Sequence, residues 1–326
     1  MNVDTQRNRP LLQIEHLTKE FKQGKDKILA VSDFSLEIRR GEIFGLVGES
    51  GCGKSTLGQM LVHLLEPTSG KILLDGQDVT KPSKKEFREL CRRMQIIFQD
   101  PYASIDTSKT VGWLLEEPLK IHGLGESPQG RREKARQMLC AAGLDESYLT
   151  RWPSELSGGQ RQRVAIALAL ILEPDFVVCD EPVSALDVSV QAQVLNLLLE
   201  LRETFGLTYL FISHDLNVVS YLSDRIGVMY LGNLVELGDS RQLSENPLHP
   251  YTKALFSAAL AAEGKAEQVL LTGDLPSPAD PPSGCPFHTR CPECTDRCKT
   301  EKPVLRPFPD GRFCSCFNGR EKDFVV

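Results

Sequence analysis

The sequence lacks a long apolar segment of the kind that spans a membrane. Its longest apolar run, residues 164–172, is followed by Glu173 and Pro174, and falls short of the roughly 18 apolar residues that a spanning helix needs. Residues 1–10 are polar and have no apolar core of a signal peptide. We therefore expect a cytoplasmic chain that reaches a membrane only through a partner.

An excess of charge of one sign is also absent. The formal net charge of -6 provides no broad basic surface for nucleic acid, so we expect no nucleic-acid partner. The 326 residues with 41% hydrophobic content are enough for one large domain or two modest ones.

A phosphate-binding pattern, G-x-x-x-x-G-K-[ST], is present at residues Gly48–Ser55. A short apolar strand pattern, Ile43–Val47, precedes it, and residues Thr56–Leu65 follow with helical spacing. Glycines let backbone N–H groups approach an anion, and a helix N-terminus favours negative charge. Lys54 would then reach the β- and γ-phosphates and Ser55 would bind Mg²⁺. The alternative, a glycine-rich turn with an ordinary surface lysine, leaves the flanking strand and helix unexplained.

Polar residues follow two other buried strand patterns. The run Phe176–Asp180 ends in adjacent carboxylates, of which Asp180 would bind Mg²⁺ and Glu181 would orient or activate water. The run Thr208–Ile212 is followed by His214, and strand ends of this kind meet at one edge of a doubly wound sheet. Solvated carboxylates and a structural histidine are the alternatives that the pattern alone leaves open.

Other segments predict the remaining organisation. Phe21 precedes a polar connection, where it would either stack on a base or lie half-buried in a strand. The pattern from Tyr102 to Leu172 is helical and indicates an insertion between core strands, and Ser157 begins a polar glycine turn that opens an apolar helix. Further strands, helices and turns are expected at 11–15, 29–38, 71–79 (hairpin), 84–93 (helix), 95–98, 226–230 and 234–236, with Gly232-Asn233 as a hairpin turn and 276–282 as a proline-rich linker.

Cysteines fall into two groups. Cys52, Cys91, Cys140 and Cys179 are scattered and predict buried or incidental thiols, whereas six others crowd between residues 285 and 316. In a reducing compartment such a cluster favours metal over disulfides. Four thiolates suit an iron–sulfur cluster or zinc, and free thiols are the remaining alternative.

Taken together, these motifs resemble the ATP-hydrolysing subunit of ATP-binding cassette (ABC) transporters over nearly the whole chain. The resemblance implies ATP and Mg²⁺ as ligands, a glutamine loop at Gln99, a catalytic glutamate at Glu181, a switch histidine at His214 and a D-loop ending at Asp187. It also implies that Leu156–Gln160 is the signature stretch, which contacts ATP held by another subunit. The residues expected at these sites are Phe21, Gly48, Ser50, Gly51, Cys52, Gly53, Lys54, Ser55 and Thr56 for nucleotide; Ser55, Gln99 and Asp180 for magnesium; Gln99, Glu181 and His214 for catalysis; and Ser157, Gly158, Gly159 and Gln160 for the signature.

Within that family the chain is similar to the oligopeptide and dipeptide importer type, as in Phe98–Tyr102, Asp180–Gln193 and Asn246–Thr252. This implies a P-loop NTPase (RecA-like) α/β core with an antiparallel β subdomain and an inserted helical subdomain at about 100–172. Residues 1–245 would form the nucleotide-binding domain and 246–326 a cysteine-rich extension. The implied partners are a second ATPase subunit, expected to be a different chain, two transmembrane permeases and an extracytoplasmic binding protein, with this chain peripheral on the cytoplasmic face of the membrane. Peptide is the expected cargo; nickel, glutathione and oligosaccharide are alternatives.

The spacing of Cys285, Cys291, Cys298 and Cys316 is similar to a cysteine set in this importer type that binds a [4Fe-4S] cluster. Zinc remains the alternative, because Cys294 is also available, and neither Cys294 nor Cys314 receives a role. Two rival functions are a soluble cassette ATPase outside transport and a metal- or redox-sensing regulator. The first usually has two cassettes or a long coiled coil, and the second needs a DNA-binding element; neither is apparent here.

Overall fold

The computed structural model describes residues 9–24, 26–262, 271 and 273–318. These residues divide into two compact units. The first contains Arg9, Arg39–Glu42 and Lys81–Leu210, and the second contains Pro10–Ile38, Ile43–Thr80 and the described residues from Phe211 onward. Among the described residues, no helix combines the length and the apolar character that crossing a membrane requires. The predicted boundary between residues 245 and 246 stays a prediction.

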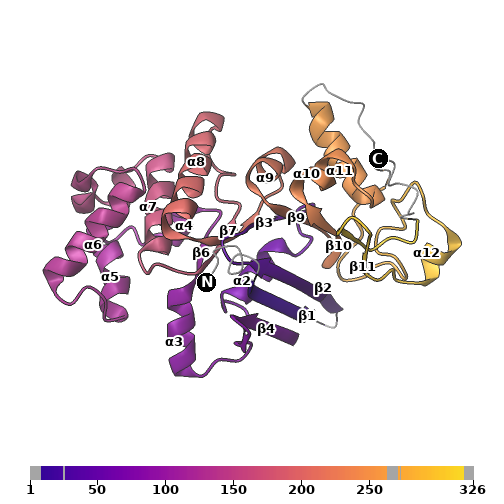
Figure 1. Ribbon diagram of the computed structural model, residues 1–326, viewed down its shortest axis with the longest axis horizontal. Coiled ribbons are helices and arrows are strands. Elements are labelled where there is room, and N and C mark those ends of the chain that lie inside the picture. Colours follow the sequence, from indigo (N-terminus) through magenta and orange to yellow (C-terminus); the bar gives the residue numbers. More distant parts are fainter. Residues whose placement is uncertain (1–8, 25, 263–270, 272, 319–326) are drawn as a thin grey trace. The chain divides into compact units, whose positions relative to one another are not determined.

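Helices dominate the first unit, where α5, α6 and α7 contact one another (Figure 1). Several of them begin at the side-chain caps that helix N-termini favour: Ser83 and Glu86 form a reciprocal capping box on α3, and Thr110 caps α5. The helices are α3 (Lys84–Arg93), α4 (Pro101–Ser104), α5 (Val111–Ile121), α6 (Pro128–Ala141), η1 (Glu146–Thr150), η2 (Pro153–Glu155), α7 (Gly158–Leu170) and α8 (Val188–Phe205). Helices α4 to α7 occupy the segment where the sequence predicts a helical insertion.

Two parallel strands lie beside these helices in the same unit. Strand β6 (Met94–Ile97) pairs with β7 (Phe176–Asp180), so that Met94 lies opposite Phe176. All five residues of β7 are buried, as expected of a strand covered on both faces. Strand β8 (Thr208–Ile212) begins in the first unit and ends in the second.

The second unit contains an antiparallel sheet with the strand order β2-β1-β4-β5. Leu12 pairs with Leu74 and Ile14 with Ile72, and all four side chains are buried. This alternation gives the sheet one apolar face. The strands are β1 (Pro10–Gln23), β2 (Asp26–Arg39), β4 (Ser69–Leu74) and β5 (Gln77–Asp78).

A mixed sheet in the same unit has the neighbours β11-β12-β10-β9-β3. Strand β3 is parallel to β9, whereas β9 and β10 form an antiparallel hairpin. The turn of this hairpin is Leu231-Gly232, with φ of 42° and 77°, one residue earlier than predicted, because Asn233 already pairs with Tyr230. The elements are β3 (Ile43–Val47), α2 (Lys54–Leu61), α9 (Leu216–Leu222), β9 (Arg225–Tyr230), β10 (Asn233–Asp239), α10 (Ser240–Glu245), α11 (Pro250–Ala262), α12 (Asp296–Thr300), β11 (Arg306–Pro307) and β12 (Phe313–Cys314).

Candidate functional site

The predicted phosphate loop connects β3 to α2 in the second unit. Lys54, the first residue of α2, is buried, and its Nζ donates to the carbonyl oxygens of Gly48 at 2.8 Å and Glu49 at 3.0 Å. The loop therefore closes around its own ammonium group. Ser50, Gly51 and Ser55 are exposed on this loop, where an anion can reach them.

Two glycines of the loop are required by its packing. Gly48 has φ of 155° and Gly53 has φ of 106°. A Cβ atom at Gly48 would overlap the carbonyl oxygen of Met229, and one at Gly53 would overlap that of Ala30. Both obstacles are backbone atoms of neighbouring strands and cannot rotate away. The loop conformation thus depends on glycine at both positions.

Cys52 lies under this loop. Its side chain is 1% exposed, and Lys54 Nζ lies 3.7 Å from its Sγ. Burial raises the pKa of the Cys52 thiol, although the neighbouring ammonium acts in the opposite direction. Cys52 is therefore a neutral packing residue of the loop.

The structure places the predicted switch histidine near the loop within the second unit. The Ser213 N–H donates to the carbonyl of Leu46, two residues before the loop begins. His214, the next residue, is exposed. Phe21 is an exposed residue of β1, and the Lys19 ammonium lies 5.1 Å from the centre of its ring. The ring therefore lies at the surface, where one of its faces makes a cation–π contact.

The predicted catalytic carboxylates lie at the end of β7 in the first unit. Asp180 is buried, and Gln99 Nε2 donates to Glu181 Oε2 at 2.9 Å. The structure thus brings together two residues that are 82 positions apart in the sequence. Glu181 has φ of 47°, a left-handed conformation that is costly for a residue with a side chain.

The predicted signature stretch forms the N-terminus of α7. Ser157 caps this helix: its Oγ accepts from the Gln160 N–H at 3.3 Å, and Gln160 Oε1 accepts from the Ser157 N–H at 3.0 Å. Gly158 and Gly159 are the first two helical residues. The helix start that the sequence predicts is confirmed, and its N-terminus presents the partial positive charge that favours anions.

Arg161 connects this helix to the segment after Gln99. Its side chain is buried and donates to the carbonyl of Pro153 at 2.7 Å. The guanidinium lies 3.7 Å from the centre of the Tyr102 ring, close enough for a cation–π interaction. The segment after Gln99 and the helix that the signature stretch opens are therefore in contact within one unit.

The predicted D-loop follows the carboxylates. The Glu181 carbonyl accepts from the Ser184 hydroxyl at 3.1 Å, and Gln191 Nε2 donates to the carbonyls of Val183 and Leu186. Asp187 is exposed at the N-cap position of α8, without a hydrogen bond from its side chain to the helix. The segment is held by its own helix while Asp187 faces solvent.

Four cysteines of the C-terminal region line one cavity. They are the four that the sequence singles out: Cys285, Cys291, Cys298 and Cys316. The cavity has about 290 Å³ of empty space, part of it open to solvent, and His249, Phe287 and His288 also line it. Cys294 and Cys314 are not among the lining residues. Cys314 packs instead with Leu248 and Phe308.

The donor set of this cavity can be tested against a metal. No group of three or more His, Cys, Asp or Glu within the described parts of the chain is arranged to hold a metal ion. Burial raises the pKa of Cys285 to about 11 and that of Cys291 to about 12. Thiols buried in this way stay neutral unless a cation compensates the thiolate. Sulfur atoms around one small cavity are the ligands that both zinc and iron–sulfur clusters use.

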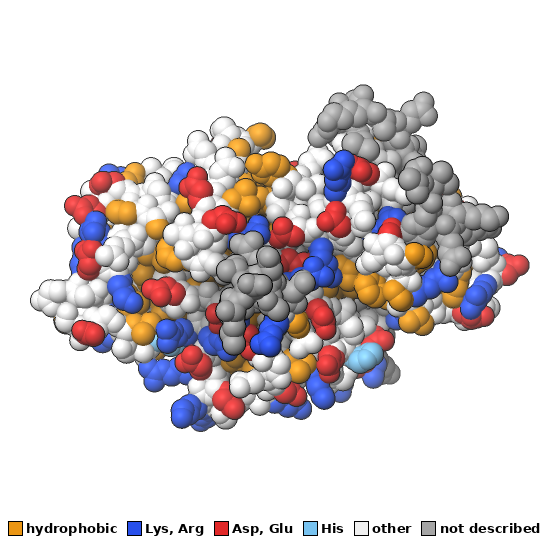
Figure 2. All heavy atoms as spheres, viewed as in Figure 1, with side chains coloured by type: hydrophobic (Ala, Val, Ile, Leu, Met, Phe, Trp, Pro, Cys, Tyr) orange, Lys and Arg blue, Asp and Glu red, His pale blue; other side chains and the backbone are white. Residues whose placement is uncertain are grey.

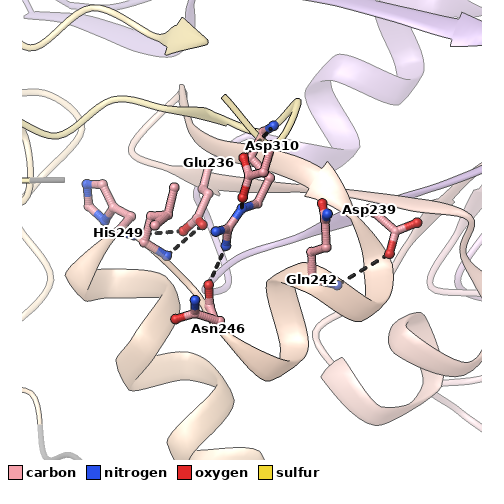
Figure 3. Close-up of polar contacts among 8 residues, drawn as sticks. Glu236, Asp239, Gln242, Asn246, His249 and Asp310 are labelled. Carbon is pink, nitrogen blue, oxygen red and sulfur yellow. Dashed lines mark hydrogen bonds and ion pairs between the residues drawn. The ribbon is translucent and has the colours of Figure 1, made fainter. Parts of the chain in front are cut away.

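A buried carboxylate fixes the start of α11 beside this cavity. Glu236 on β10 accepts from the backbone N–H groups of Leu248 at 2.8 Å and His249 at 2.9 Å (Figure 3). Burial raises the pKa of Glu236, and the hydrogen bonds oppose this. Arg312 bonds both Asp310 and the carbonyl of Asn246 in the same region (Figure 3).

Sequence comparison shows the family of the chain. The profile described as ABC transporter matches residues 31–184, and the one described as oligopeptide/dipeptide transporter, C-terminal region, matches residues 235–298. The putative oligopeptide transport ATP-binding protein YkfD of Bacillus subtilis is 50% identical over 315 residues, which are 95% of this chain and 96% of that protein. The chain belongs to the ABC transporter ATPases of the oligopeptide/dipeptide importer type. The oligopeptide transport ATP-binding protein AppF of the same organism is 48% identical over 91% of both chains.

Solved cassettes have the fold of this ABC ATPase. The dimeric, post-hydrolysis structure of the cassette MJ0796 bound to ADP and Pi matches with a TM-score of 0.64 and 31% identity, over 71% of this chain and 99% of that chain. The structure of cbiO1 from Clostridium perfringens matches with a TM-score of 0.65 and 29% identity, over 73% and 92%. The chain thus has the P-loop ABC ATPase fold with mixed α/β content and hydrolyses ATP, for which ATP and Mg²⁺ are the fitting ligands.

The surface of this ABC ATPase carries mixed charge. Figure 2 shows Lys and Arg side chains interspersed with Asp and Glu side chains over the face in view. A nucleic-acid interface instead gathers basic groups on one face or along one element. The sequence-based exclusion of a nucleic-acid partner stays a prediction.

Sequence reasoning missed three residues around the loop. Glu49 falls on a variable position of the pattern, yet Arg290 forms an ion pair with it and the Tyr251 hydroxyl accepts from its N–H. These partners lie 241 and 202 positions away. No local pattern in the sequence indicates such contacts. Arg290 directly precedes a cysteine of the cluster, but this position does not point to Glu49.

Proposed function

We propose that this ABC ATPase powers the import of dipeptides and oligopeptides through a membrane transporter. The observation that carries the proposal is the 50% identity, over nearly the full length of both chains, to a protein named for oligopeptide transport. The match of residues 235–298 to the C-terminal region of oligopeptide/dipeptide transporters supports the same cargo. In this proposal residues 1–245 are the nucleotide-binding domain and residues 246–326 the cysteine-rich extension.

Hydrolysis would take place at a composite site between two ATPase subunits. The phosphate loop, with Lys54 and Ser55, would hold ATP together with Phe21. The partner subunit's signature stretch, equivalent to Ser157–Gln160 of this chain, would close over the γ-phosphate. Asp180, Ser55 and Gln99 would bind Mg²⁺. A helix N-terminus and a glycine-rich loop are both anion-binding features, which supports this assignment.

Glu181 would act as the general base, and Asp187 and His214 would complete the site. The hydrogen bond from Gln99 to Glu181 supports this assignment, because it orients a carboxylate at the strand end where a magnesium-binding Asp180 also lies. ATP binding would favour the closed pair of subunits and hydrolysis the open pair, since a ligand shifts an equilibrium only by binding the two states differently.

The partners that follow are a second, different ATPase subunit, two permeases and an extracytoplasmic peptide-binding protein. The chain would then lie at the cytoplasmic face of the membrane as a peripheral subunit. Purification of the tagged protein from native membranes in mild detergent tests this. Two permeases, a second cassette ATPase and a peptide-binding protein should copurify. Recovery with ribosomal or DNA-repair proteins alone would overturn the transport role and keep the ATPase.

Uptake measurements test the cargo. A strain that lacks this chain should lose uptake of a labelled tripeptide, and the wild-type chain should restore it while the Glu181→Gln variant should not. Nickel, glutathione and a short oligosaccharide are measured in parallel. Restoration of one of these in place of the tripeptide would reassign the cargo while leaving the importer assignment intact.

We further propose that Cys285, Cys291, Cys298 and Cys316 bind a [4Fe-4S] cluster, with zinc as the alternative. The support is that these four thiols line one cavity whereas Cys294 and Cys314 do not. A bound metal would supply the positive charge that lets the buried thiols ionise. The group would then have a structural role, holding the segments that contain the four cysteines around one centre.

Metal analysis after anaerobic purification tests this assignment. We expect about four iron and four sulfide per chain if the cluster is present. The Cys291→Ser variant should lose them, and Cys294→Ser, a matched change in the same segment, should keep them. Stoichiometric zinc without iron would show that the site binds zinc instead of a cluster. The absence of both metals would overturn the proposed metal site.

A further inference from the structure

Glu49 in the phosphate loop is held through three of its groups. Its N–H donates to the Tyr251 hydroxyl at 2.9 Å, and its carbonyl accepts from Lys54 Nζ at 3.0 Å. Both carboxylate oxygens accept from Arg290, at 2.8 and 3.1 Å. Tyr251 and Arg290 belong to the C-terminal region, beyond the residues that form the loop and its flanking elements. That region therefore fixes the loop directly.

The geometry of the ion pair makes it more than a surface contact. Two parallel N–H···O bonds define the orientation of a carboxylate as well as its position. The Arg290 side chain is 9% exposed and that of Glu49 is 27% exposed, so water screens the pair only in part. The pKa of Arg290 is raised chiefly by its hydrogen bonds to Glu49. The guanidinium is thus a permanent positive partner for the loop.

Tyr251 is fixed as firmly as Arg290. It is fully buried, and its ring packs against Tyr230 at 4.7 Å and Phe287 at 5.4 Å between centroids. Its N–H donates to His249 Nδ1 at 3.1 Å. Because the ring cannot move without disturbing this aromatic group, the hydroxyl is a rigid acceptor for the Glu49 N–H.

The loop geometry explains why Glu49 matters for nucleotide. Lys54 Nζ rests on the carbonyls of Gly48 and Glu49. A rotation of the Glu49 peptide would displace one of these oxygens and with it the ammonium. It would also turn the neighbouring N–H groups, whose direction determines how well a loop of this kind receives phosphate.

We infer that Arg290 and Tyr251 are positioning residues for ATP, which hold Glu49 and thereby keep the phosphate loop in its binding conformation. This inference rests on the proposed role of Gly48–Ser55 as the phosphate site. Neither residue touches the nucleotide in this assignment. Their effect is on nucleotide affinity, because a loop that must be ordered on binding lowers the apparent affinity by the fraction of time it spends disordered.

Two conservative variants of the full-length protein test the inference. Arg290→Lys keeps the charge but loses the bidentate pair, and Tyr251→Phe removes only the hydroxyl acceptor. Each should raise the dissociation constant of a fluorescent ATP analogue with Mg²⁺, and the KM for ATP, by roughly five-fold, the value of one lost hydrogen bond. The kcat at saturating ATP should stay within about two-fold of wild type, because the chemical groups are untouched.

Matched controls separate positioning from general stability. Arg312→Lys changes a buried arginine–carboxylate pair of the same C-terminal region that does not contact the loop. Tyr209→Phe removes a buried hydroxyl that bonds the Leu198 carbonyl at 3.2 Å. Both controls should lower the melting temperature and leave the KM for ATP unchanged.

A double-mutant cycle identifies Glu49 as the target of Arg290. Glu49→Gln should raise the dissociation constant for the ATP analogue about as much as Arg290→Lys does. The double variant should bind the analogue no less tightly than the single variant that binds it less tightly. Additive effects would show that Arg290 acts elsewhere and would overturn the inference. So would variants that melt earlier but bind ATP as wild type does. If wild-type protein itself fails to bind MgATP, the phosphate-site proposal fails instead.

Discussion

The side-chain amide of Gln99 donates a hydrogen bond of 2.9 Å to the carboxylate of Glu181. This contact joins the end of β6 to the end of β7 within one compact unit. It holds the carboxylate that we assign as general base at the end of the strand.

Replacement of Glu181 by Gln should nearly abolish hydrolysis and leave ATP binding intact. The amide keeps the shape of the side chain but cannot accept a proton, so we expect kcat to fall on the order of 10²-fold or more. Glu173→Gln is a matched control, because Glu173 belongs to the same unit and also has a left-handed backbone, with φ of 54°. Persistent turnover in Glu181→Gln, measured as phosphate release, would assign the base to another residue.

Alanine substitutions in the phosphate loop should differ in severity according to the space at each glycine. Gly51→Ala introduces a side chain where no atom lies within 4 Å, with φ of 78°. It should cost only the left-handed conformation, about 1–2 kcal/mol. Gly53→Ala also overlaps the backbone of Ala30, so its loss of unfolding free energy should be clearly larger. Denaturant unfolding checks the order, and equal losses would contradict the packing explanation.

Mild acid should destabilise the second unit through His249. Burial lowers the pKa of this side chain to about 3, and its Nδ1 accepts from the Tyr251 N–H. When the pKa of a histidine is lower in the folded than in the unfolded protein, its full contribution to the unfolding free energy is present above the unfolded pKa of about 6.5. This contribution is lost as the pH falls below that value. The loss should be about 1.4 kcal/mol per pH unit below that value.

The variant His249→Asn isolates this effect. It retains an acceptor near the position of Nδ1 but does not titrate. Between about pH 6.5 and pH 5.5, the unfolding free energy of the variant should fall less steeply than that of wild type. Parallel curves for the two proteins would show that His249 does not carry the pH dependence.

Loss of the proposed metal from the cysteine cavity should weaken ATP binding. Arg290 directly precedes Cys291, and Phe287, which packs on Tyr251, lines the cavity. Disorder of this segment should therefore release Glu49. We expect chelated protein or the Cys298→Ser variant to show a several-fold higher dissociation constant for the ATP analogue, while Cys294→Ser behaves as wild type. An unchanged affinity for the ATP analogue after metal loss would show that the cysteine cavity does not influence the phosphate loop.

Much of the fold could be predicted because its elements have clear local signals. The helix over Lys84–Arg93 has a serine cap and a reciprocal glutamate, and the strand over Thr208–Ile212 consists of β-branched, aromatic and aliphatic residues, all of them buried. Both were predicted with the bounds that the structure shows. The helix after the phosphate loop begins at Lys54, two residues before its predicted start, because the motif lysine is itself its first helical residue.

The contacts around Glu49 could not be predicted in the same way. Periodicity and motif spacing describe neighbours along the chain, whereas Arg290 and Tyr251 reach Glu49 only through the folded second unit. The choice of four among six clustered cysteines came from a family resemblance rather than from spacing alone. The cavity lined by these four supports that choice, whereas Cys314 is not a lining residue and packs with Leu248 and Phe308.

The separation of Glu49 from Arg290 also sets an order of events during synthesis. The loop leaves the ribosome 241 residues before the arginine that holds it. At roughly 5–20 residues per second, that interval is on the order of 10–50 s. Throughout it the nascent chain has its phosphate pattern but lacks the ion pair that orders the loop. In this proposal, full affinity for ATP is acquired late, only after the segment that contains Arg290 has been synthesised and has folded back onto the loop.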